Sequence, residues 1–300
     1  MSSGPWSLQV ERGGAVETLT QGYGLIEAPL WKEGRGLLFS DVLNGGVFCL
    51  DGDGNVSTLF EHRRGIGGMA QHVVGGLVVS GRNISFKPFD GGPTRLILDR
   101  NPEAGNVGYN DLTTDAAGRI YAGSLGTSPV FESEGEARPG GLWLIDLDGS
   151  AREVGHDIWI TNGLGFSPDG RTLYHSDSQV QTVWQYAVDN DGSLGPKQVF
   201  VQVDNGVPDG LVVAEDGSVW VALARGGHGV AIYSSEGRQL DFIEIPEPMC
   251  TSLCFGGSDL QDLYIVSGSD GSSSESAGAV HRVRTGVAGL PVAPAAVALA

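Results

Sequence analysis

The chain is 300 residues long and contains 48 glycines, about twice the share of glycine in an average protein. Because glycine costs roughly 1 kcal/mol at each position inside a helix, this composition excludes a fold built on long helices. The formal net charge of −18 repels phosphate backbones and anionic lipid surfaces. We therefore expect a small molecule as the ligand, with no nucleic-acid partner and no membrane partner.

No segment of the sequence has the pattern of an export signal or a membrane span. The first 14 residues lack a basic stretch followed by an apolar one, and no apolar run reaches the ~20 residues that cross a bilayer. The three cysteines form no disulfide framework, which favours the cytoplasm. We expect one domain over residues 1–300, with an N-terminal extension at 1–14, a C-terminal tail at 293–300, and a monomeric state.

One pattern recurs along the chain at intervals of roughly 40–50 residues. Each copy begins with a small polar or acidic residue and a glycine or alanine, followed by an apolar strand, a turn and a second strand. In chain order, the six copies start at Glu27, Gly68, Asn110, Asn162, Asp209 and Thr251. Glycine and aspartate in the turns supply the positive φ angles that hairpins need. A third and a fourth strand follow in most copies.

Four-stranded units at this period are typical of a β-propeller, so the six copies predict an all-β, six-bladed ring. The last copy has no clear fourth strand of its own. The N-terminal residues 15–20 would supply that strand and close the ring. A β-sandwich is the alternative all-β fold, but sandwiches do not repeat at this interval.

Polar residues precede the first strand of most copies, and in a propeller the first strands line the central channel. Glu27, Asn162 and Asp209 share this position, so we expect their oxygen atoms to converge at one rim of the channel. Buried carboxylates need a cation or a proton, and hard oxygen ligands suit Ca²⁺, Mg²⁺ or Mn²⁺. Zn²⁺ or Fe²⁺ are further possibilities. The alternative, that Asn-Gly and Asp-Gly are turns here, is weaker because each repeat already has a turn further along.

The third copy places Asn110 and Asp111 together at the rim. Asn110 is in register with the polar residues of the other copies, whereas strand alternation predicts that Asp111 faces away from it.

The chain resembles the family of regucalcin, gluconolactonases and luciferin-regenerating enzymes. The resemblance spans roughly residues 22–292 and rests on phrases such as EAPLW at Glu27, ITNGLGFSPDGRTLY at Ile160 and PDGLVV at Pro208. It implies a six-bladed propeller with one divalent metal ion, held by Glu27, Asn162 and Asp209. It also implies that Asp209 is the general base and that Asn110 contacts the substrate or the metal.

The sequence departs from this family at Gly108, where the sugar lactonases carry an arginine. Arg82 on the neighbouring blade is the candidate replacement, with a salt bridge at the rim as its alternative role. Tyr109, next to Asn110, and Trp159, shortly before Asn162, are candidates for lining the substrate site. His228 is either a residue of the site mouth or an ordinary turn residue.

We therefore expect a divalent-metal-dependent lactonase in which activated water opens a cyclic ester and Asp209 takes the proton. Three alternatives stay open at this stage: hydrolysis of phosphotriesters, a lyase or isomerase reaction at the same metal, and a metal-stabilised propeller that binds without catalysis.

Overall fold

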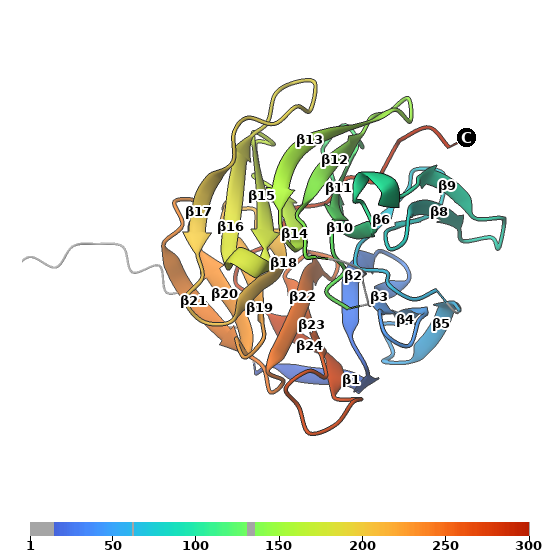
Figure 1. Ribbon diagram of the computed structural model, residues 1–300. Helices are drawn as coiled ribbons and strands as arrows, with labels where there is room; N and C mark the ends of the chain where they lie inside the picture. The colour runs from blue at the N-terminus through green and yellow to red at the C-terminus, as the bar shows by residue number, and fades with distance from the viewer. Residues whose placement is uncertain (1–14, 62, 131–135, 300) are drawn as a thin grey trace, which may run out of the picture.

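The computed structural model describes residues 15–61, 63–130 and 136–299, and the predicted extension at 1–14 lies outside them. The described strands form six four-stranded antiparallel sheets arranged around a central axis (Figure 1). The predicted all-β six-bladed propeller is therefore confirmed. The helical segments of these residues are two short 3₁₀ turns, η1 (Pro102–Ala104) and η2 (Ser178–Val180). In this part of the chain, no helix is long and apolar enough to cross a membrane.

Every blade runs from an innermost strand at the channel outward through three further strands. In that order, blades 1 and 2 consist of β2 (Ile26–Lys32), β3 (Gly36–Asp41), β4 (Val47–Leu50) and β5 (Val56–Phe60), then β6 (Met69–Gln71), β7 (Gly76–Val79), β8 (Ile84–Pro88) and β9 (Arg95–Leu98). Blades 3 and 4 consist of β10 (Gly108–Thr114), β11 (Ile120–Leu125), β12 (Gly140–Ile145) and β13 (Ala151–Ile158), then β14 (Thr161–Phe166), β15 (Thr172–Asp177), β16 (Thr182–Ala187) and β17 (Gln198–Gln202). Blades 5 and 6 consist of β18 (Val207–Val213), β19 (Val219–Ala224), β20 (Gly229–Tyr233) and β21 (Gln239–Glu244), then β22 (Met249–Gly256), β23 (Asp262–Gly268), β24 (Gly278–Arg284) and β1 (Glu17–Tyr23).

The N-terminal strand β1 closes the ring, as the sequence predicts. It pairs antiparallel with β24, from Glu17 opposite Arg282 to Tyr23 opposite Gly278. The first described strand thus becomes the outermost strand of the last blade. Main-chain hydrogen bonds between β1 and β24 join the N-terminal strand to the last three strands in one sheet, and this pairing closes the ring.

The hydrophobic core lies between neighbouring blades. Trp31 of blade 1 stacks on Tyr264 of blade 6 with ring centroids 5.4 Å apart, and Trp220 of blade 5 meets Phe255 of blade 6 edge-on at 5.3 Å. Burial of such apolar faces between sheets supplies most of the driving force for closing the ring. The core therefore fixes the angle between blades and, with it, the positions of the innermost strands.

The segment after β24 crosses the channel at the end remote from the starts of the innermost strands. The amide N–H of Leu290 donates to Val213 O, that of Ala295 to Gln71 O, and that of Ala298 to Leu147 O. Ala295 and Val297 are buried. The described part of the predicted tail, residues 293–299, thus packs against blades 2 and 3.

Candidate functional site

A β-bulge interrupts most innermost strands near their starts. The pairing register shifts between Glu27 and Leu30 in β2, between Tyr109 and Leu112 in β10, and at the matching places of β14, β18 and β22. The short strand β6 of blade 2 pairs regularly instead. A bulge breaks the alternation of side chains and turns them toward one side. Five blades therefore change the direction of their side chains at the rim where the sequence places the polar residues.

Asn162 and Asp209 lie within β14 and β18 and are not turn residues. The glycine after Asn162 serves the contact between blades. A Cβ atom on Gly163 would lie 2.1 Å from Leu211 N and 2.5 Å from Gly210 C. The innermost strands of blades 4 and 5 can approach this closely only because no side chain separates them, and this approach sets the distance between the two site residues.

Three carboxyl groups from alternate blades lie within electrostatic reach of one another. Burial raises the pKa of Glu27 well above its ordinary value, and the charges of Asp209 and Asp111 raise it further. Burial, followed by the charge of Asp111, raises the pKa of Asp209 in the same way. Burial also raises the pKa of Asp111 to about 7. The expectation that Asp111 faces away is wrong, because the bulge after Tyr109 breaks the alternation on which it rests.

Two amide side chains complete the rim and are oriented by a hydrogen-bond chain. Ser178 Oγ donates to Pro208 O at 2.7 Å, so the same oxygen must accept from Asn162 Nδ2, which lies 2.8 Å away. This assigns Asn162 Oδ1 to the opposite side, where Asn110 Nδ2 donates to it at 2.7 Å. Asn110 Nδ2 also donates to Thr161 O at 2.8 Å. Ser178, which the sequence did not single out, therefore decides which atom Asn162 presents.

Arg225 is a second site residue that the sequence pattern did not reveal. It follows β19 directly, and its positive charge lowers the pKa of Asp209 against the effects of burial and of Asp111. Ala224, the residue before it, pairs with Val207 at the start of β18, the end of that strand nearer to Asp209. The signal was available in the sequence, since Arg225 opens the RGGHG segment from which only His228 was selected.

The remaining predicted residues fall into two groups. Arg82, Trp159 and His228 are exposed in connections at the same end of the blades as Asp209. Tyr109 is only 2% exposed, packs in the core of blades 2 and 3, and donates its hydroxyl to Asp99 O at 3.1 Å. The structure therefore does not bring Tyr109 into the site.

Gly108, at the place of the family arginine, lies against the backbone of blade 2. A Cβ atom there would lie 2.9 Å from Gly81 O and 3.6 Å from Arg82 Cα. The β7–β8 connection that carries Arg82 thus occupies the space beside Gly108, and its backbone exchanges hydrogen bonds with Tyr109 through Gly81.

The donor set at the rim fits a hard divalent cation. Asp209 Oδ1 is buried and has no hydrogen-bond partner in the part of the chain that the structure describes. Carboxylate and amide oxygens are the ligands that such cations prefer. Among the residues that the structure describes, no three His, Cys, Asp or Glu side chains gather in a metal-binding arrangement.

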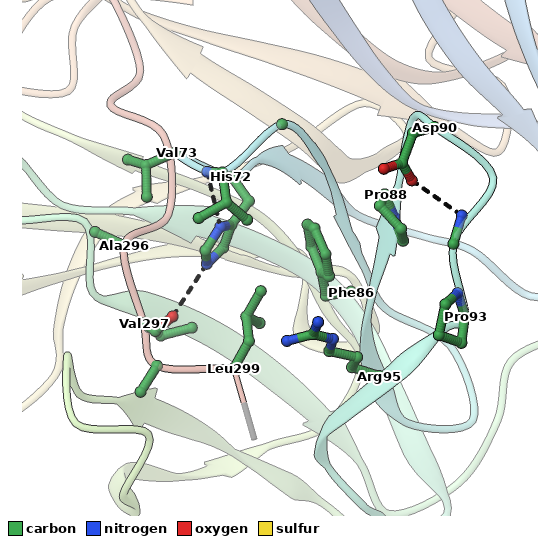
Figure 2. Close-up of a pocket in the computed structure, with 14 residues that line it drawn as sticks. His72, Val73, Phe86, Pro88, Asp90, Pro93, Arg95, Ala296, Val297 and Leu299 are labelled. Atoms are coloured by element: carbon green, nitrogen blue, oxygen red, sulfur yellow. Dashed lines mark hydrogen bonds between the residues drawn. The ribbon is translucent and has the colours of Figure 1, made fainter.

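A separate pocket of about 580 Å³ lies at the opposite end of blade 2, beneath the C-terminal segment (Figure 2). His72, Phe86 and Arg95 line it, and His72 Nε2 lies 3.0 Å from Val297 O. Its residues lie in the β6–β7 and β8–β9 hairpins and in the C-terminal segment, remote from the rim of the channel, so this pocket is not part of the candidate site.

Comparison with known proteins agrees with this architecture. Residues 25–269 match the family described as "SMP-30/Gluconolactonase/LRE-like region". A 6-deoxy-6-sulfogluconolactonase of Pseudomonas putida is 33% identical over 83% of this chain and 85% of its own, and regucalcin of Xenopus laevis is 28% identical over 93% and 97%. A solved structure of luciferin-regenerating enzyme superposes with a TM-score of 0.83 at 25% identity, covering 94% of this chain and 99% of that one. The chain belongs to the SMP-30/gluconolactonase/LRE-like family.

Proposed function

We propose that this protein is a divalent-metal-dependent lactonase whose active site is the acid and amide cluster at the channel rim. The observation that carries the proposal is Asp209, which is buried near two further carboxyl groups and has one oxygen without a hydrogen-bond partner among the described residues. A cation is the simplest group that satisfies such an oxygen and offsets the crowded negative charge. Relatives named as lactonases support hydrolysis of a cyclic ester as the reaction.

Glu27, Asn162 and Asp209 would hold the metal through two carboxylates and one amide oxygen. Ca²⁺ is the first candidate, and Mg²⁺, Mn²⁺, Zn²⁺ and Fe²⁺ are alternatives. When bound, the metal supplies Lewis-acid polarisation of the ester carbonyl and lowers the pKa of water. The chain of hydrogen bonds from Pro208 through Ser178 leaves Asn162 Oδ1 on the side of Asn110, where it would be available to the metal.

Asp209 would act as the general base. Its carboxylate takes a proton from water as the water oxygen bonds to the lactone carbonyl carbon. The ring C–O bond then breaks, and the proton passes to the departing ring oxygen, which leaves an open hydroxy acid. Asn110 donates its Nδ2 to Asn162 Oδ1, and its own amide oxygen lies against Gly67 of blade 2. We propose that Asn110 contacts the substrate or the metal.

The substrate would be a small lactone bound at the end of the channel where the innermost strands begin. Arg82, Trp159 and His228 are the exposed residues of this end that we propose for substrate contacts. We further propose that the protein works as a monomer in the cytoplasm.

The test is a metal-replacement assay on a panel of aliphatic, aromatic and sugar lactones with one phosphotriester added. We expect dialysis against a chelator to abolish lactone hydrolysis and one divalent metal to restore it. Turnover of the phosphotriester alone would replace the proposed activity with phosphotriesterase activity. No metal-dependent turnover of any compound would favour a binding propeller.

A further inference from the structure

We propose that Arg225 forms an oxyanion-binding subsite at the mouth of the channel and selects lactones that carry a carboxylate or sulfonate away from the ester. The inference rests on the proposed lactonase function and names the chemical class of its substrate. It places the recognition of charge on blade 5, the blade that also supplies Asp209.

The connection that carries Arg225 is short and held in place. It runs from Arg225 to His228 between β19 and β20, and both of these residues have left-handed backbones, with φ of 50° and 58°. Gly226 N donates to Pro248 O at 2.8 Å, and Ile245 N donates to His228 O at 2.8 Å. Non-glycine residues in this conformation cost energy and are concentrated at functional sites. The hydrogen bonds fasten the connection to the chain that leads into β22.

The guanidinium of Arg225 is available for a ligand. Among the described residues it makes no ion pair and no hydrogen bond, and Arg225 is exposed. Ala224, the residue before Arg225, pairs with Val207 at the end of β18 that carries Asp209, and Asp209 Oδ1 has no hydrogen-bond partner among the described residues. Arg225 therefore lies near the reacting end of the site without closing onto the catalytic carboxylate.

The negative charge around Arg225 indicates which kind of substrate would benefit from its guanidinium. The three carboxyl groups Glu27, Asp111 and Asp209 exceed the charge of one divalent cation, and the whole chain carries a net charge of −18, so an anionic substrate gains from a further positive charge at the mouth. A guanidinium matches carboxylate and sulfonate oxygens with two parallel hydrogen bonds. A neutral lactone would gain much less from such a residue.

The experiment compares a matched pair of substrates, the γ-lactones of gluconate and glucarate, which differ by a carboxylate in place of a hydroxymethyl group. We expect Arg225→Gln to raise KM for the glucarate lactone roughly 10- to 100-fold and to change KM for the gluconate lactone less than about 2-fold. Arg225→Lys should restore part of the difference. Arg238→Gln is the control, because it removes the same charge from blade 5 at the β20–β21 turn of the opposite face and should change neither value.

Measurements of lactone binding distinguish the proposed anion subsite from the proposed lactonase activity. Calorimetry on Asp209→Asn should show the glucarate lactone binding more tightly than the gluconate lactone, and Arg225→Gln in the same background should remove that preference. Charge-selective binding without turnover in the wild type would uphold the subsite and contradict the lactonase. Equal effects of Arg225→Gln on both lactones, or no effect on either, would overturn the subsite while the lactonase stands.

Discussion

Blades 2 and 5 lie opposite each other in the six-membered ring and share one architecture, yet they contribute differently to the site. In blade 5 the innermost strand β18 has seven residues and a bulge, and it carries Asp209. In blade 2 the innermost strand β6 has three residues, pairs regularly and begins just after two glycines, Gly67 and Gly68. The comparison shows that a short, regularly paired innermost strand is enough to build a blade. The candidate site depends instead on a bulged innermost strand that carries an acidic residue.

Blade 2 still serves the site by leaving space. A Cβ atom on Gly67 would lie 2.0 Å from Asn110 Oδ1, so the amide of blade 3 occupies the volume that a blade 2 side chain would fill. The rim is therefore asymmetric. Blades 1, 3 and 5 contribute acidic side chains, blades 3 and 4 contribute amide side chains, and blade 2 contributes a glycine that leaves space for Asn110.

The largest expected effect comes from removing the acid of blade 5. Asp209→Asn should lower kcat for lactone hydrolysis roughly 10²- to 10⁴-fold, because the base that takes the proton is lost. The measurement is steady-state hydrolysis with saturating metal. Glu215→Gln is the control, since it removes one exposed charge from blade 5 at the opposite face and should leave kcat unchanged. Undiminished hydrolysis with metal still bound would end the assignment of Asp209 as base.

A stability effect should follow from pushing blades 4 and 5 apart. Gly163→Ala places a methyl group against the backbone of Leu211 and should lower the free energy of unfolding by roughly 1–3 kcal/mol. Urea unfolding followed by tryptophan fluorescence measures the loss. Gly52→Ala is the matched control, because nothing lies within 4 Å of its added Cβ. Equal stability of both variants would show that the strand contact is not tight.

The sequence predicted the ring and most of the rim, because the repeat places chemically similar residues at equivalent positions of each blade. Glu27, Asn162 and Asp209 could be found this way. Asp111 could not, because a bulge is a local break in a pattern that the prediction assumes to be regular.

Two other residues were missed because they lie outside the repeat. Ser178 comes from a connection of blade 4 and donates to Pro208 of blade 5. Arg225 comes from a connection of blade 5 and acts on Asp209, which lies on the innermost strand of the same blade. Which connection reaches which blade depends on the closed ring and cannot be read from one copy of the pattern. Tyr109 was selected for its place beside Asn110, but the packing of blades 2 and 3 buries it.

A smaller effect should come from loosening the amide of blade 4. Ser178→Ala removes the acceptor that fixes Asn162 Nδ2, so the affinity for the divalent metal should fall roughly 10- to 100-fold. Calorimetric titration of the metal into the chelator-treated protein measures the dissociation constant. Ser235→Ala, in the exposed β20–β21 turn, should leave it unchanged. An unchanged affinity in Ser178→Ala would mean that Asn162 is not a ligand or that it needs no support.

The smallest expected effect concerns the pH dependence of the metal-free protein. The pKa of Asp111 is about 7 in the folded state and ordinarily 3.8, so between these values the folded protein holds a proton that the unfolded chain has lost. This contribution to stability is therefore lost as the pH rises through that window.

His175, whose buried ring has a pKa lowered to about 3, changes the stability with the opposite sign and would hide the effect in a single stability curve. The difference between Asp111→Asn and wild type cancels His175: in chelator, the variant should gain stability relative to wild type from about pH 5 to about pH 8 in urea unfolding. Saturating metal should flatten that difference, and a difference independent of pH without metal would place Asp111 outside the acid cluster.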